Sequence, residues 1–109
     1  VMQKATGVSP FNPPEKLTEL ARNDAFARVP VALLYDTDTT GGNSGSPVMD
    51  SRGNIVGVNF DRATEATIND YAWSSDYSRS IGVDIRYVLW VTWQIGGADR
   101  LLAEMGVSP

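Results

Sequence analysis

The chain has 109 residues, of which 42% are apolar, and 9 Lys and Arg against 13 Asp and Glu give a net charge of -4. This length allows one ordinary domain with a core, and the acidic balance without blocks of like charge argues against a nucleic-acid surface. The absence of Cys and His excludes disulfides and thiol chemistry and makes a zinc site improbable, and no apolar run is long enough to span a membrane.

The first third of the chain predicts a helix followed by a buried strand. Residues 1–14 are polar and contain three prolines, so we expect irregular structure there. Pro14 suits the first position of a helix, and spaced apolar residues predict that this helix covers residues 14–27. The apolar run at 29–35 predicts a buried strand, with Pro30 near its start, where a missing N–H does least harm.

A loop rich in Gly, Thr, Asn and Ser follows at 36–46, and a β-hairpin follows the loop. Residues 47–50 predict its first strand, 51–54 the turn around Gly53-Asn54, and 55–60 the returning strand. The polar residues 61–79 carry scattered aromatic side chains and predict a long structured loop.

The last part of the chain predicts a short strand and two helices. The strand covers 81–83, and Asp84 is placed to cap a helix over about 85–95, with an ion pair to nearby Arg86. Gly96-Gly97 ends this helix, and a final amphipathic helix covers 98–105. The predicted fold class is mixed β with α.

Ser44 lies between glycines at the end of the 36–46 loop, where a strand and then a hairpin flank it. A serine nucleophile needs a nearby base, an exposed and tightly turned backbone, and N–H groups aimed at the developing oxyanion. Gly42 has access to backbone angles closed to other residues, so its N–H can turn inward beside that of Ser44. In the trypsin-like arrangement these two N–H groups form the oxyanion hole. If Ser44 is a nucleophile, its general base lies on residues outside this sequence, because the chain contains no His.

Three other interpretations of this loop are a plain connecting turn, a phosphate-binding loop and a lipase-type elbow. A Gly- and Ser-rich segment between strands is also an ordinary connecting turn without function. A phosphate-binding loop needs a Lys after its glycines, and a lipase-type elbow needs a helix directly after the serine, whereas Pro47-Val48-Met49 predicts a strand. The complete run GNSGSP, followed by strand, glycine turn and strand, favours the serine nucleophile.

Residues 37–60, TDTTGGNSGSPVMDSRGNIVGVNF, resemble the nucleophile region of the S46 peptidases. The likeness continues through Asp61-Arg62 and 79–89 and reaches back to 14–17. It implies a bacterial dipeptidyl-peptidase on a chymotrypsin-like double β-barrel of antiparallel strands, with an added helical domain. This chain would be its C-terminal fragment. Residues 1–28 would end the helical region or linker, and 29–109 would form the C-terminal part of the barrel with terminal helices.

The resemblance implies Ser44 as nucleophile, with Gly42 and Ser44 forming the oxyanion hole. The triad His and Asp would lie in the N-terminal remainder of the parent chain, so the fragment alone should be an inactive part of an EC 3.4.14-type hydrolase. The family implies oligopeptide substrates, no metal or organic cofactor, a periplasmic location and a homodimer. Asn43 stands where trypsin-like enzymes carry an Asp that pairs with a newly cut N-terminus, so zymogen activation of that kind is not expected.

Asp61 and Arg62 end the strand that lines the S1 pocket in this fold. A guanidinium there favours Asp or Glu at P1 through a bidentate ion pair. An arginine at this position resembles the acidic-specific subfamily, dipeptidyl-peptidase 11. Asp61 is a candidate for holding the α-amine of the substrate. Both residues are alternatively surface charges at a strand end. The chain as a whole is alternatively a non-catalytic peptide-binding or structural module on a trypsin-like fold.

Overall fold

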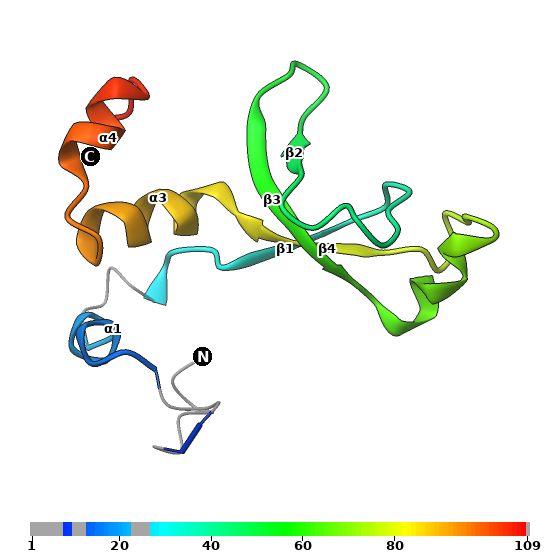
Figure 1. The fold of residues 1–109 in the computed structure, drawn as a ribbon, viewed down its shortest axis with the longest axis horizontal. Coiled ribbons are helices and arrows are strands. Elements are labelled where there is room, and N and C mark those ends of the chain that lie inside the picture. Colours follow the sequence, from blue (N-terminus) through cyan, green and yellow to red (C-terminus); the bar gives the residue numbers. More distant parts are fainter. Residues whose placement is uncertain (1–7, 10–12, 23–26, 109) are drawn as a thin grey trace. The chain divides into compact units, whose positions relative to one another are not determined.

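A computed structural model describes residues 8–9, 13–22 and 27–108. The chain divides into two compact units, one formed by Val1–Val29 with Trp90–Pro109 and the other by Pro30–Leu89. The elements in chain order are α1 (Glu15–Leu20), β1 (Ala32–Tyr35), β2 (Pro47–Met49), β3 (Ile55–Arg62), the 3₁₀-helix η2 (Thr64–Asp70), β4 (Ser80–Asp84), α3 (Ile85–Gln94) and α4 (Asp99–Glu104) (Figure 1). The mixed β and α class is confirmed.

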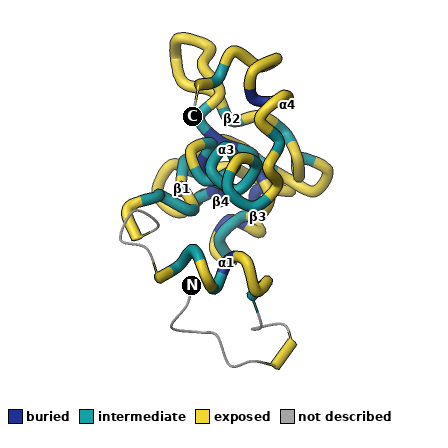
Figure 2. The backbone as a smooth tube through the Cα atoms, turned by 90° about the vertical axis from the view of Figure 1, so that its left-hand side faces the viewer, coloured by how far each residue is buried: buried dark blue, intermediate teal, exposed yellow. Residues whose placement is uncertain are grey.

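The unit Pro30–Leu89 is built on one antiparallel sheet with strand order β1-β4-β3-β2. The two central strands, β3 and β4, hold the buried positions of the sheet (Figure 2), which are Gly57, Asn59, Ser80, Gly82 and Asp84. The apolar side chains of the outer strands remain largely exposed, as Leu34 on β1 and Met49 on β2 show. Apart from Ala66, the best-buried side chains of this unit are therefore polar and are held by hydrogen bonds.

A β-bulge interrupts the pairing of β3 with β4. Asn59 pairs with Gly82, but the next pair is Asp61 with Ile81, so Phe60 is an extra residue on β3. A bulge bends its strand and redirects the side chains that follow it. It determines the directions in which the side chains of the last residues of β3, Asp61 and Arg62, point.

The unit formed by the two ends of the chain is helical. α1 buries Leu17 and α4 buries Leu102, and Lys16 Nζ donates to the Ile95 carbonyl oxygen at 2.9 Å. None of the helices in the described ranges has the length and apolar character that crossing a bilayer requires.

The predicted cap of the helix after β4 is confirmed. Asp84 Oδ1 accepts the N–H of Arg86 at 2.9 Å, and the Arg86 guanidinium pairs with Asp84 Oδ2 at 2.7 Å. The helix predicted at 98–105 matches α4 to within one residue at each end.

Several predicted boundaries were wrong. α1 ends at Leu20, and residues 23–26 of the helix predicted over 14–27 lie outside the described residues. The strand predicted at 29–35 begins only at Ala32, where pairing with β4 starts. β3 continues to Arg62, because β4 offers partners as far as Ser80.

The segment predicted as a loop over 61–79 contains the helix η2. Its fully buried Ala66 holds it in place, although the surrounding sequence has no helical apolar periodicity. The last residue of this helix, Asp70, forms an ion pair with Arg62.

Candidate functional site

The Gly-Ser loop, defined here as residues 39–46, consists of two consecutive tight turns. Asn43 N–H donates to the Thr40 carbonyl at 3.3 Å, and Ser46 N–H donates to the Asn43 carbonyl at 3.0 Å. The third residue of each turn is a glycine with positive φ, 96° at Gly42 and 87° at Gly45. Positive φ at this position is characteristic of a type II turn, which explains why glycines flank the serine.

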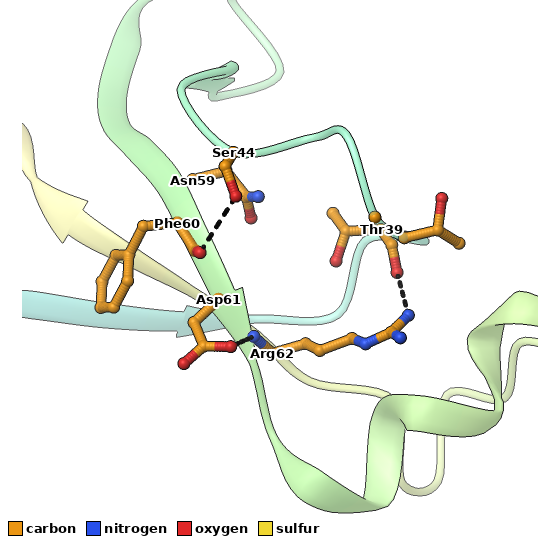
Figure 3. A pocket seen from close by; sticks show the side chains of 8 residues that line it. Thr39, Ser44, Asn59, Phe60, Asp61 and Arg62 are labelled. Carbon is orange, nitrogen blue, oxygen red and sulfur yellow. Dashed lines mark hydrogen bonds between the residues drawn. The ribbon is translucent and has the colours of Figure 1, made fainter.

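The Gly-Ser loop lies along the end of β3, beyond the last residue that pairs with β2. Gly45 N–H donates to the Asn59 carbonyl at 2.8 Å, and Asn59 N–H donates to the Ser46 carbonyl at 2.9 Å. The exposed Ser44 hydroxyl donates to the Phe60 carbonyl at 3.3 Å (Figure 3). The bulge leaves Phe60 out of register with β4, and its carbonyl faces the serine instead.

The N–H groups of Gly42 and Ser44 have no acceptor among the described residues, whereas Asn43, Gly45 and Ser46 between and after them all donate. Backbone N–H groups seldom stay without a partner in a folded protein unless solvent or a ligand takes that place. These two donors are therefore available to an anionic group near Ser44.

A cavity of about 130 Å³ lies between the Gly-Ser loop and the end of β3. Three of the four predicted site residues line it, namely Ser44, Asp61 and Arg62. The other lining residues are Thr39, Thr40, Gly41, Asn59 and Phe60. Gly42 is not among the lining residues.

The Arg62 guanidinium is held at one edge of this cavity by a carboxylate that sequence analysis missed. Nη1 and Nη2 donate to the two oxygens of Asp70 at 2.9 and 3.1 Å, and Nη1 also donates to the Thr39 carbonyl at 3.4 Å. The Arg62 side chain is 21% exposed and that of Asp70 48%. The hydrogen bonds from Arg62 lower the pKa of Asp70, and the same bonds raise the pKa of Arg62.

Asp61 and Arg62 are neighbours in sequence, but their side chains diverge. Arg62 runs toward Thr39, whereas the Asp61 carboxylate points the other way (Figure 3). The Arg62 N–H donates to Asp61 Oδ1 at 2.8 Å. Within the described ranges no group of three or more acidic residues is arranged to hold a metal ion.

Comparison with known proteins places this site in a family. The family model of peptidase S46 matches residues 1–107. The Asp/Glu-specific dipeptidyl-peptidase of Porphyromonas gingivalis is 54% identical over 86 residues, which are 79% of this chain and 12% of that relative. Dipeptidyl-peptidase 7 of Capnocytophaga gingivalis is 39% identical over 108 residues, 93% of this chain and 15% of the relative.

Solved structures of peptidases also resemble this chain. The crystal structure of Porphyromonas endodontalis DPP11 in complex with the dipeptide Arg-Asp is 35% identical with a TM-score of 0.88, and the match covers 98% of this chain and 16% of that one. The chain thus spans a small part of the length of the relatives that it matches. The match with the family model over nearly all residues, together with this structural likeness, shows that the chain belongs to the peptidase S46 family.

Proposed function

We propose that this chain carries the nucleophile side of a serine dipeptidyl-peptidase active site, which releases dipeptides from the N-termini of peptides. The observation that supports this most is the Gly-Ser loop. It exposes the Ser44 hydroxyl at a cavity and leaves the N–H groups of Gly42 and Ser44 without acceptors among the described residues. A relative that is 54% identical to this chain is an Asp/Glu-specific dipeptidyl-peptidase.

In the proposed reaction Ser44 Oγ attacks the carbonyl carbon of the second substrate residue, and a His base takes the hydroxyl proton. The carbonyl oxygen becomes an oxyanion, which the N–H groups of Ser44 and Gly42 stabilise. The protonated base returns its proton to the leaving amine, and a dipeptidyl ester remains on Ser44. Water, activated by the same base, hydrolyses the ester and restores the serine.

The His and Asp of the triad are proposed to come from the remainder of a parent chain. This sequence has no His, and it spans only 12% of the length of its Porphyromonas gingivalis relative. We propose that the sheet described here is part of a chymotrypsin-like double barrel, whose other strands cover exposed apolar residues such as Leu34. The 109 residues alone are expected to hydrolyse nothing, because they supply no general base.

Arg62 is proposed to bind an acidic P1 side chain. A guanidinium has five N–H donors, of which Asp70 and the Thr39 carbonyl occupy three. The remaining two, on Nε and Nη2, share one edge of the guanidinium and have no acceptor among the described residues. These two N–H groups can donate to the two oxygens of a second carboxylate. Arg62 is therefore able to bind an acidic side chain without releasing Asp70.

Asp61 is proposed to hold the substrate's N-terminal ammonium. Its carboxylate is exposed beside the cavity and points away from the Arg62 guanidinium, so the two charges would recognise different groups of the substrate. A periplasmic location and a homodimer of the intact protein are proposed from the family resemblance. Fractionation of a bacterial host and light scattering would test these two proposals.

The central test is Ser44→Ala in the intact peptidase, with Ser51→Ala in the exposed hairpin turn as matched control. We expect Ser44→Ala to lower kcat by about 10³-fold or more and to abolish labelling by a fluorophosphonate serine probe. The control should keep both. Turnover and labelling that survive in Ser44→Ala would refute the assignment. Peptide binding without turnover or labelling in the wild type would favour the non-catalytic module.

A further inference from the structure

The peptide group between Asn43 and Ser44 is held from one side. Its carbonyl oxygen accepts two hydrogen bonds, from Ser46 N–H at 3.0 Å and from Asn59 Nδ2 at 3.1 Å. A trans peptide is planar, so its C=O and N–H point in opposite directions. Fixing the Asn43 carbonyl therefore also fixes the direction of the Ser44 N–H, which has no acceptor of its own among the described residues.

Asn59, whose side chain contributes one of these bonds, is buried, with 5% of the residue exposed. Because the Asn43 carbonyl can only accept, the amide nitrogen of Asn59 must face it, and the amide oxygen faces the other way. There Oδ1 accepts a hydrogen bond from the Tyr35 hydroxyl. Burial raises the pKa of Tyr35, so the hydroxyl remains a donor at neutral pH. Hydrogen bonds thus run in one direction from Tyr35 through Asn59 to Asn43.

The position of Tyr35 depends in turn on β4. A Cβ atom added at Gly82 would lie 3.1 Å from Tyr35 Cε1 and 3.3 Å from its hydroxyl oxygen. The tyrosine ring therefore lies directly against a strand position where no side chain intervenes. The first two members of the hydrogen-bonded series are thereby tied to the central strands, because Tyr35 lies against β4 and Asn59 belongs to β3.

We propose that Asn59, oriented by Tyr35, is a positioning residue that keeps the Ser44 N–H directed at the developing oxyanion. The proposal rests on the proposed function, in which that N–H is an oxyanion donor. Without the Asn59 amide the Asn43 carbonyl keeps only the turn bond from Ser46, and the peptide group is freer to rotate. An interaction with the oxyanion is made only in the transition state, so its loss lowers kcat and leaves KM nearly unchanged.

The test uses Asn59→Leu, a near-isosteric and uncharged change, and Tyr35→Phe, which removes a single oxygen, in the intact peptidase. We expect Asn59→Leu to lower kcat by about tenfold or more, below the roughly 10²- to 10³-fold for deletion of an oxyanion donor itself. Tyr35→Phe should lower kcat by about two- to tenfold, as expected for one neutral hydrogen bond. KM should change by less than about threefold in both.

A second measurement separates positioning from general damage to the fold. The inhibition constant of an acidic-P1 dipeptidyl boronic acid, which forms a tetrahedral adduct with serine, should rise by the factor by which kcat/KM falls. Binding of the product dipeptide Arg-Asp should stay unchanged. The double variant should be no slower than Asn59→Leu alone, because Tyr35 acts through Asn59.

The outcomes distinguish this inference from the proposed function. An active Ser44→Ala would overturn the proposed function itself. An inactive Ser44→Ala beside an Asn59→Leu with unchanged kcat, or with a raised KM alone, would overturn only the role of Asn59. Additive effects in the double variant would remove Tyr35 from it. If Asn59→Leu does not fold, an unchanged kcat in Tyr35→Phe overturns the inference.

Discussion

The two sides of the cavity are held by different kinds of interaction. On one side the Gly-Ser loop is fixed by neutral hydrogen bonds to its own turns and to Asn59, which is buried. On the other side the Arg62 guanidinium is fixed by an ion pair with Asp70, whose side chain is about half exposed. A network of neutral groups holds one geometry at any ordinary pH, whereas an exposed ion pair weakens with acid and salt.

This difference suggests that the two sides of the proposed site have separate roles, one in reaction rate and one in substrate choice. The loop would determine how fast the chemistry runs, because its donors act on the transition state. Arg62 would determine which substrate is chosen, because the free edge of its guanidinium would pair with an acidic side chain. Mutations on the two sides should therefore change different kinetic quantities.

The largest effect on substrate choice is expected from Arg62→Gly. The loss of the guanidinium leaves an acidic P1 side chain without its partner, which should lower kcat/KM for Asp or Glu at P1 by about a hundredfold or more. Substrates with apolar P1 should gain in relative rank. Kinetics on a series of dipeptidyl substrates check this, with Arg52→Gly in the exposed hairpin turn as control. An unchanged P1 ranking would show that Arg62 does not line S1.

A large effect on rate alone is expected from Gly42→Ala. An alanine at φ 96° is strained by roughly 1–3 kcal/mol, and relief of that strain turns the Gly42 N–H away. We expect kcat to fall by about tenfold to a hundredfold. Gly53→Ala is a matched control, because Gly53 also has positive φ, 84°, and open space at the Cβ position. It should lose similar stability without losing kcat, and equal kinetic losses in both would point to strain alone.

Part of this arrangement could be read from the sequence. Glycine and proline mark the loop and the hairpin, so the exposure of Ser44 between two strands was predictable from local turn chemistry. The partners Asn59 and Asp70 were not. Asn59 meets Asn43 across 16 positions of sequence, and Asp70 meets Arg62 from the 3₁₀-helix η2, where the sequence predicted a loop. The register shift at Phe60 depends on how β4 pairs with β3, and no local pattern encodes it.

A smaller effect is expected from Gly82→Ala, which lies on β4 and does not line the cavity. The added methyl would crowd Tyr35 and also approach the Val58 carbonyl oxygen to 3.1 Å. Displacement of Tyr35 would weaken its bond to Asn59, so kcat should fall by about two- to tenfold with KM nearly unchanged. If Gly82→Ala also slows the Tyr35→Phe variant by the same factor, the effect does not pass through the tyrosine hydroxyl.

The smallest effect is expected on stability, from Asp70→Asn. Because Arg62 lowers the pKa of Asp70 in the folded protein, the ion pair stabilises the fold above the usual Asp pKa, about 3.9, and this contribution is lost as the pH falls through the lowered folded value. The melting temperature of Asp70→Asn should therefore lie below that of the wild type at pH 7 and approach it in acid. In an Arg62→Gly background the same change should have no such pH dependence, because the partner is absent. A difference between wild type and Asp70→Asn that stays constant from neutral to acid pH would mean that the ion pair contributes nothing to the stability of this side of the cavity.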